Sequence, residues 1–173
     1  MTRSVELRRH TAADGDVLTP EGVRDALGVG SRLRDEYDSA ISSGAQRATQ
    51  TLACFLAGSN AKVTGGVVVD ARFRSDVEDR WKAAYQAAGA GDIESFRRVA
   101  PDLVAEESEI LGGALEDAFA NLPEGGSALV VGHSPMLEVA LYGLTGEIIE
   151  PLSKGAGVLV SEEDGSYRLE PLD

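Results

Sequence analysis

Short apolar segments alternate with amphipathic ones along the chain, and this alternation predicts an α/β fold. The clearest strand signal is the continuous apolar run Ala128–Val131, which glycines bound and a new helical pattern follows. Near the end, Val158–Ser161 and Tyr167–Leu169 flank a turn and predict an antiparallel hairpin at a sheet edge. Three earlier segments predict further strands: Ser4–Arg8, Ser39–Ser42 and Val63–Val69.

Helical periodicity fills the intervals between these strands. Thr19-Pro20-Glu21 is typical of a helix start, with an N-cap threonine, a proline at the first helical position and an early acid. The expected apolar face of this helix consists of Val23, Leu27, Gly30 and Leu33. After the second strand, a further amphipathic helix is predicted from Ala45, Ala48, Leu52, Phe55 and Leu56.

The middle of the chain is predicted to be helical, with a break at Gly89–Gly91. Two apolar stripes define it. The first stripe consists of Val77, Trp81 and Tyr85, and the second of Leu103, Ile110, Leu111, Leu115 and Phe119.

Length and composition narrow the class of protein. At 173 residues and 43% hydrophobic content, the chain can bury the core of a single domain, expected to span residues 1–173. The net charge of −13 opposes non-specific binding to nucleic acid or to an anionic membrane surface. The single cysteine cannot form an internal disulfide, the N-terminus is polar, and no apolar run approaches a membrane span, so a cytoplasmic location is expected.

Both histidines of the chain follow predicted strands. His10 comes after the first strand, Arg47 lies early in the helix after the second, and His133 follows the apolar strand near the end. Ligands of open α/β sheets gather at the carboxyl ends of the strands. We therefore expect these three side chains to meet at one edge of the sheet.

This combination of residue types suits phosphoryl transfer. Arginine offers planar, permanently charged donors to phosphate oxygens, and helix N-termini add backbone N–H groups. A neutral histidine can attack phosphorus, so that a phosphohistidine divides one difficult displacement into two. A second histidine could donate to a non-bridging oxygen. Taken singly, an Arg-His pair is usually a solvated surface feature, and Ser42-Ser43 with Arg47 could merely cap a helix.

The ordered set of motifs resembles the histidine phosphatase superfamily, with its phosphoglycerate-mutase-like fold, and especially the short SixA-like phosphohistidine phosphatase branch. The resemblance spreads along the chain. In chain order, the matching residues are Leu7, Arg9 and His10; Leu18-Thr19, Gly22 and Ala26; Ser42-Ser43, Arg47-Ala48 and Gln50-Thr51; Val131-Gly132-His133-Ser134-Pro135; and Leu144-Thr145-Gly146 with Lys154-Gly155-Ala156.

The resemblance implies a three-layer α/β/α sandwich with a mostly parallel central sheet. It implies that His10 is the phosphorylated nucleophile, that Arg9 and Arg47 clamp the phosphoryl group, and that His133 is the second imidazole of the pocket. The backbone N–H of Ser134 would be a further donor. Neither a metal nor a cofactor is implied.

Several positions depart from the family pattern. Thr11 stands where glycine is usual, so the turn must avoid positive φ, and the Thr11 hydroxyl could replace a lost substrate contact. Acidic Asp14 and Asp16 lie in the following loop and could repel a highly anionic substrate. The segment Asp70–Ser75 resembles the D-P-R-L-x-E motif of larger members, but serine occupies the position of the acid.

Neighbouring acids, Asp76 and Glu78, are therefore the candidates for a displaced proton donor. The expected function is a metal-independent phosphohydrolase with a phosphohistidine intermediate, acting on a phosphorylated small molecule or a phosphoprotein. A mutase is disfavoured because 173 residues provide little room for inserts that would retain a bulky sugar acid. A phosphate-binding module without turnover and a solvated ion-pair surface remain alternatives, and the sequence does not indicate the oligomeric state.

Overall fold

A six-stranded sheet forms the centre of the computed structural model, which describes residues 1–173. The strand order is β10-β9-β1-β8-β5-β7. Four neighbouring strands run parallel: β1 (Arg3–Arg9), β8 (Ser127–Gly132), β5 (Ser39–Ser42) and β7 (Val67–Val69). The hairpin of β9 (Gly157–Glu163) and β10 (Ser166–Leu172) adds two antiparallel strands on the side of β1. The predicted C-terminal edge hairpin is thereby confirmed.

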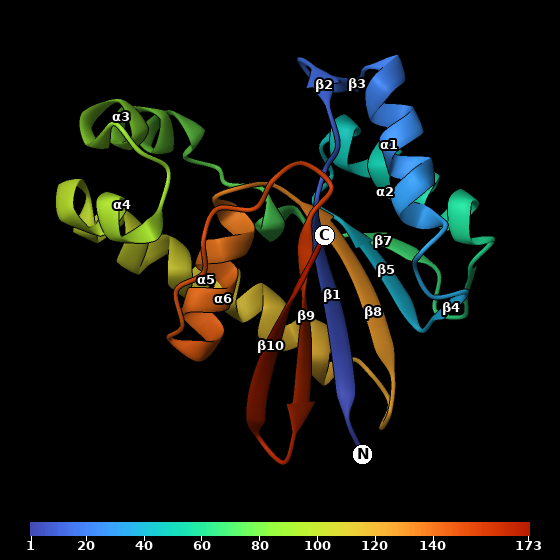
Figure 1. Cartoon of the computed structure of the whole chain (residues 1–173). Coiled ribbons are helices and arrows are strands. Elements are labelled where there is room, and N and C mark those ends of the chain that lie inside the picture. The colour runs from blue at the N-terminus through green and yellow to red at the C-terminus, as the bar shows by residue number, and fades with distance from the viewer.

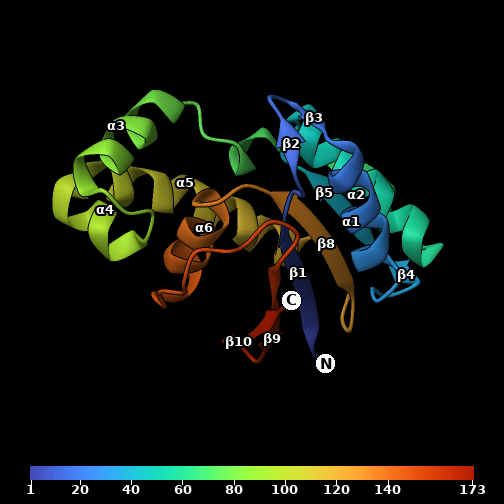
Figure 2. The ribbon, with the colours of Figure 1, turned by 45° about the horizontal axis from the view of Figure 1, so that its top comes forward.

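Helices cover both faces of the sheet (Figures 1 and 2). On one face lie α1 (Pro20–Gly30) and α2 (Gln46–Ser59), and on the other lie α5 (Pro101–Ala120) and α6 (Met136–Thr145). The three-layer α/β/α sandwich with a mostly parallel sheet is therefore confirmed. None of the helices is both long and apolar enough to cross a lipid bilayer.

Strand β8 shows why the run Ala128–Val131 is continuously apolar. Successive side chains of a strand point to opposite faces. Leu129 and Val131 belong to the core beneath α1 and α2, whereas Ala128 and Val130 belong to the larger core beneath α5 and α6. All four residues are at most 1% exposed, as expected for a central strand covered on both faces.

Helices α1 and α2 pack closely through small residues, which corrects the predicted apolar face of α1. A Cβ at Gly30 would lie 2.6 Å from the carbonyl oxygen of Phe55, and one at Gly58 would lie 2.5 Å from that of Leu27. The buried residues of α1 are Gly22, Ala26 and Gly30. Leu27 is 40% exposed, whereas Val29 and Leu33, the latter beyond the end of the helix, pack partly buried against the same core.

The expected single strand Val63–Val69 is wrong. Its first part forms β6 (Lys62–Val63), which pairs with β4 (Glu36–Tyr37) in a separate two-stranded sheet, and its last part forms β7. A turn divides them, because Gly66 adopts φ +80° and the Gly65 N–H donates to the carbonyl of Asp38 at 2.7 Å.

The helical middle consists of the short 3₁₀ helix η1 (Ala71–Phe73), α3 (Glu78–Ala88), α4 (Ile93–Val99) and α5. The predicted break is confirmed, since Gly89 ends α3 in the left-handed conformation. Trp81 is buried, but Tyr85 and Ile110 are 55% and 49% exposed, so they do not belong to the core stripes predicted for them. Helices α3 and α4 lie beyond the sheet, to one side of the sandwich (Figures 1 and 2).

Candidate active site

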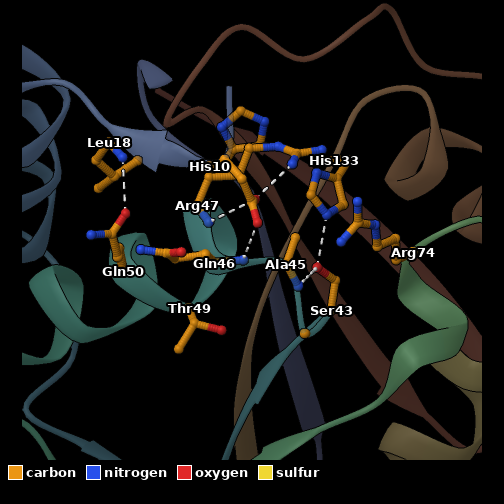
Figure 3. A network of polar contacts seen from close by, with 12 residues as sticks. His10, Leu18, Ser43, Ala45, Gln46, Arg47, Thr49, Gln50, Arg74 and His133 are labelled. Carbon is orange, nitrogen blue, oxygen red and sulfur yellow. Dashed lines mark hydrogen bonds and ion pairs between the residues drawn. The ribbon is translucent and has the colours of Figure 1, made fainter. Parts of the chain in front are cut away.

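The carboxyl ends of β1, β5 and β8 bring the two histidines together. The parallel register sets Arg9 beside Gly132, and the backbone N–H of His10 donates to the carbonyl of Gly132 at 3.0 Å. The His10 and His133 ring centroids are 5.3 Å apart. Figure 3 shows both imidazoles at this edge, with Arg47 nearby. The sequence-based expectation that these side chains meet is confirmed.

His10 is held in one tautomer by its own turn. Its Nδ1 lies 2.7 Å from the carbonyl oxygen of Thr11, and because a carbonyl only accepts, Nδ1 carries the proton. The lone pair is therefore on Nε2. Burial, together with the nearby charges of Arg47, Arg9 and Lys154, lowers the pKa of His10 to about 4, although the hydrogen bond to Thr11 opposes this shift. At neutral pH, His10 is therefore an uncharged imidazole with a lone pair on Nε2.

His133 is held from the other side by Ser43, which follows β5. The His133 Nε2 lies 2.7 Å from the Ser43 hydroxyl, which accepts from the Ala45 N–H at 3.4 Å and can therefore donate its proton to the ring. In that arrangement the single N–H proton of the His133 ring is on Nδ1, which is buried and has no partner in the chain. Burial, followed by the charge of Arg47, lowers the pKa of His133 to about 3. A neutral donor is thus available to a bound anion.

These pKa values lead to a direct prediction for the free protein. Because the chain has only two histidines, imidazole ¹⁵N NMR can follow both, with His10→Gln and His133→Gln variants assigning the signals. We expect two neutral rings from pH 8 down to about pH 5.5, His10 protonated at Nδ1, and titration near pH 4 and 3. Titration of either ring near the ordinary value of 6.5 would contradict this description.

Four cationic side chains surround the two neutral rings. Arg47 and Arg9 were predicted to lie here, whereas Arg74 and Lys154 had no assigned role. Figure 3 shows Arg74 beside His133, and the charge of Arg74 lowers the pKa of that ring. Arg74 occupies the variable position of the D-P-R-L-x-E-like segment, so its sequence position carried no signal. A protein of net charge −13 therefore concentrates positive charge at this one edge.

Arg9 is anchored by the loop that precedes β9. Its Nη1 donates to the carbonyl of Leu152 at 2.8 Å, while its Nε is buried without a partner. Glu138, which is 2% exposed, accepts from the Leu152 N–H at 3.1 Å and from the Ser134 hydroxyl at 2.8 Å. Burial raises the pKa of Glu138. This carboxyl, which sequence reasoning missed, connects the turn after His133 to the loop that holds Arg9.

Arg47 is paired with a carboxylate from the loop after His10. This loop forms a short hairpin of β2 (Ala13–Asp14) and β3 (Val17–Leu18), with Asp16 at its tip. The Asp16 carboxylate accepts from the Arg47 Nη1 at 2.8 Å, and from the backbone N–H groups of Arg47 and Gln46, each at 3.2 Å. Asp14 is exposed and makes no such contact.

Ser75, which stands where the family motif has an acid, has a structural role. Ser75 is 7% exposed, and its hydroxyl donates to the buried carboxylate of Glu107, which also accepts from the Trp81 indole at 3.0 Å. Glu78 is exposed and pairs with Arg74 at 2.9 Å. Asp76 is exposed as well. Neither acid makes a hydrogen bond or ion pair with His10 or His133, and Glu78 is connected to the site only through Arg74.

Thr11 supports the turn after β1. Its hydroxyl donates to the carbonyl of Gly22 at 2.8 Å, and its N–H donates to the Thr51 hydroxyl at 3.2 Å. It is 2% exposed, and its φ is not positive, as expected for a β-branched residue in this turn. These contacts stabilise the turn, and Thr11 is not part of the binding site proposed below.

A cavity of about 590 Å³ is lined by Arg9 and Ser134, the chain neighbours of the two histidines, although neither histidine lines it. Arg9 and Ser134 form its wall on the side of the site, and Trp81, Lys82 and Tyr85 of α3 form much of the rest. The exposed Tyr85 thus lines a cavity rather than the core. The remaining lining residues are Gly91, Phe96, Pro135, Met136 and Pro151.

Comparison with solved structures shows that the fold is that of phosphoglycerate-mutase-like histidine phosphatases. A phosphoglycerate mutase from Bacillus anthracis matches with a TM-score of 0.74 and 18% identity, over 99% of this chain and 92% of that one. A phosphoserine phosphatase from Entamoeba histolytica, in complex with 3-phosphoglyceric acid, matches with a TM-score of 0.75 and 16% identity, over 99% and 97%. The protein histidine phosphatase SixA, complexed with tungstate, matches with a TM-score of 0.61 and 18% identity, over 98% and 96%.

No protein-family model and no curated protein matches the sequence. At these identities the likeness establishes the fold. The coverage also corrects one argument from length, because a chain described as a mutase is matched over 92% of its residues. A chain of 173 residues is therefore not too short for the fold of a mutase.

Proposed function

We propose that this protein is a metal-independent phosphohydrolase that forms a phosphohistidine on His10 and transfers the phosphoryl group to water. The observation that carries the proposal is the pair of buried, neutral imidazoles, 5.3 Å apart, among four cationic side chains. Solved structures of this fold include proteins described as phosphatases and one bound to tungstate, a tetrahedral oxyanion. These likenesses support phosphoryl chemistry here.

In the first step, the Nε2 lone pair of His10 forms a bond to phosphorus while the bond from phosphorus to the carrier breaks, and the carrier leaves with that electron pair and takes its proton from solvent. Arg9 and Arg47 contact the non-bridging oxygens, where negative charge accumulates. His133 donates from Nδ1, which is buried without another partner, and the backbone N–H of Ser134 is a further donor. In the second step, water bonds to phosphorus, the bond to Nε2 breaks, and a water proton passes to solvent.

We infer that the cavity of about 590 Å³ holds the part of the substrate that carries the phosphoryl group. Its wall combines the aromatic rings of Trp81, Tyr85 and Phe96 with two cations, Arg9 on the side of the site and Lys82 on α3. These side chains favour a carrier with a flat or apolar portion, on a phosphorylated small molecule or on a phosphoprotein.

The structure offers no obvious acid for the leaving group. Ser75 donates to Glu107, and Glu78 is paired with Arg74. Protonation of a departing alkoxide typically contributes about 10²–10⁴-fold. Leaving groups that need little protonation are therefore the preferred substrates.

We accordingly expect clear hydrolysis of aryl phosphates and phosphoramidates, and alkyl phosphates hydrolysed at least about 100-fold more slowly. Initial rates on matched aryl and alkyl esters test the proposal. Asp76→Asn and Glu78→Gln should each change aryl phosphate turnover by less than about tenfold.

Similar rates on both classes of ester, with a loss confined to alkyl esters in one of these two variants, would identify that residue as the acid. Phosphoryl transfer to an added hydroxyl acceptor in place of phosphate release would indicate a mutase. Binding without release of phosphate from any compound would indicate a non-catalytic module.

A further inference from the structure

The anion-binding groups of this site already hold a carboxylate from the chain itself. Asp16 accepts three hydrogen bonds, one from the Arg47 guanidinium and two from the first N–H groups of α2. Unpaired N–H groups at a helix start and an arginine side chain are the donors that a phosphoryl group would use. One internal carboxylate therefore occupies both kinds of donor at once.

The surroundings of Asp16 are those of the site. Its charge partly opposes the lowering of the His133 pKa, and it adds to the effect of Glu78 in raising the pKa of Arg74. The hydrogen bonds from Arg47 and Gln46 lower the pKa of Asp16 itself. Asp16 is therefore ionised at neutral pH and is a poor proton donor, which excludes it as the missing acid.

We propose that Asp16 is a tethered carboxylate that competes with the phosphoryl group of the substrate for Arg47 and the start of α2, and so sets the affinity of the site for anions. The proposal rests on the function proposed above for this site. A substrate must supply enough negative charge on its phosphoryl group to displace Asp16. The residue thereby weakens the binding of phosphate and of weakly charged anions.

The hairpin is built so that its tip can leave while its base stays in place. Leu18 at the base is 7% exposed, and its N–H donates to the Gln50 side chain at 2.9 Å, a contact visible in Figure 3. At the tip, Gly15 adopts φ +61° and the Asp16 side chain is 46% exposed. Release of Asp16 breaks only the three hydrogen bonds described.

Asp16→Asn tests the proposal, because asparagine retains an oxygen that can cap α2 but removes the charge. The binding of inorganic phosphate and of vanadate is measured by isothermal titration calorimetry, and KM and kcat are measured on an aryl phosphate. We expect both anions to bind about threefold to fivefold more tightly and KM to fall by the same factor, the range for a partly exposed ion pair. The difference between wild type and variant should shrink as salt is raised.

Asp14→Asn is the matched control, since it removes one negative charge from the same hairpin without removing a contact to Arg47. Its anion affinity should equal that of the wild type. An equal gain in both variants would overturn the proposal, because it would reflect net charge alone. Unchanged anion binding in Asp16→Asn would also overturn it, and weaker binding or a fall in kcat would indicate instead that Asp16 positions Arg47.

The experiments distinguish failure of the proposed phosphohydrolase function from failure of the proposed competition by Asp16. If no phosphorylated compound is hydrolysed but Asp16→Asn binds phosphate and vanadate more tightly, Asp16 is a competitor in a binding module, and only the phosphohydrolase is rejected. If hydrolysis is observed but anion affinity does not rise in Asp16→Asn, the phosphohydrolase stands and the competition is rejected. Thermal unfolding of both variants confirms that each retains the fold.

Discussion

His10→Ala is expected to lose turnover entirely, a decrease on the order of 10³-fold or more. The Nε2 lone pair of His10 is the proposed nucleophile, while the backbone N–H of residue 10 continues to donate to Gly132. The substitution therefore removes the nucleophile without removing the contact that joins β1 to β8. Thermal unfolding should show a folded protein.

The intermediate itself can be observed. Brief incubation of the wild type with ³²P-labelled substrate, followed by denaturation, should trap an acid-labile, base-stable adduct, as expected of phosphohistidine. His133→Ala is the control, because it removes the neighbouring donor and retains the nucleophile, so that labelling should be slower but present. An adduct that persists in His10→Ala would refute the assignment of His10.

Arg47→Ala should reduce turnover by about 100-fold or more. The guanidinium meets charge that accumulates on the phosphoryl oxygens in the transition state, so its loss should lower kcat more than it raises KM. Arg47→Lys should recover only part of the rate, since an ammonium group has the charge but not the planar pair of donors. Arg80→Ala is a suitable control, because Arg80 is an exposed arginine paired with Glu106 on the surface of the helical region.

The affinities of the wild type and Arg47→Ala for vanadate and for phosphate distinguish an enzyme from a binding module. A site built for five-coordinate phosphorus should bind vanadate well below the concentration at which phosphate binds, and Arg47→Ala should remove most of this preference. Equal, weak affinity for both anions, together with no hydrolysis, would favour the module.

The sequence predicted the parts of the structure that local patterns determine. Strand β8 is a continuous apolar run because both its faces are covered, and Gly89 ends α3 because a left-handed residue is required there. The positions of His10 and His133 followed from the rule that strand ends meet at one edge. The motif resemblance supplied Arg9 and Arg47, and the fold brings all four residues to that edge.

The remaining features depend on contacts between distant residues. Asp16 accepts a hydrogen bond from Arg47, which lies 31 positions away in the chain. The sequence alone predicted only that Asp16 could repel the substrate. Ser75 was recognised as a substitution, but its partner Glu107 lies 32 positions away on α5. The division of β6 from β7 follows from the hydrogen bond between Gly65 and Asp38, which no pattern of apolar residues encodes.

The placement of α3 and α4 beyond the sheet separates two tasks within one short chain (Figure 1). The groups proposed to bind the phosphoryl group come from the ends of β1, β5 and β8 and from the start of α2, whereas Trp81, Lys82 and Phe96 on α3 and α4 line the cavity proposed for the carrier. Exchange of the segment 76–100 would therefore alter which molecule is accepted and leave the reacting centre in place. A lineage that carries this architecture can diversify its substrates by changing about one seventh of its residues, and a combinatorial library confined to that segment would explore the same diversity in the laboratory.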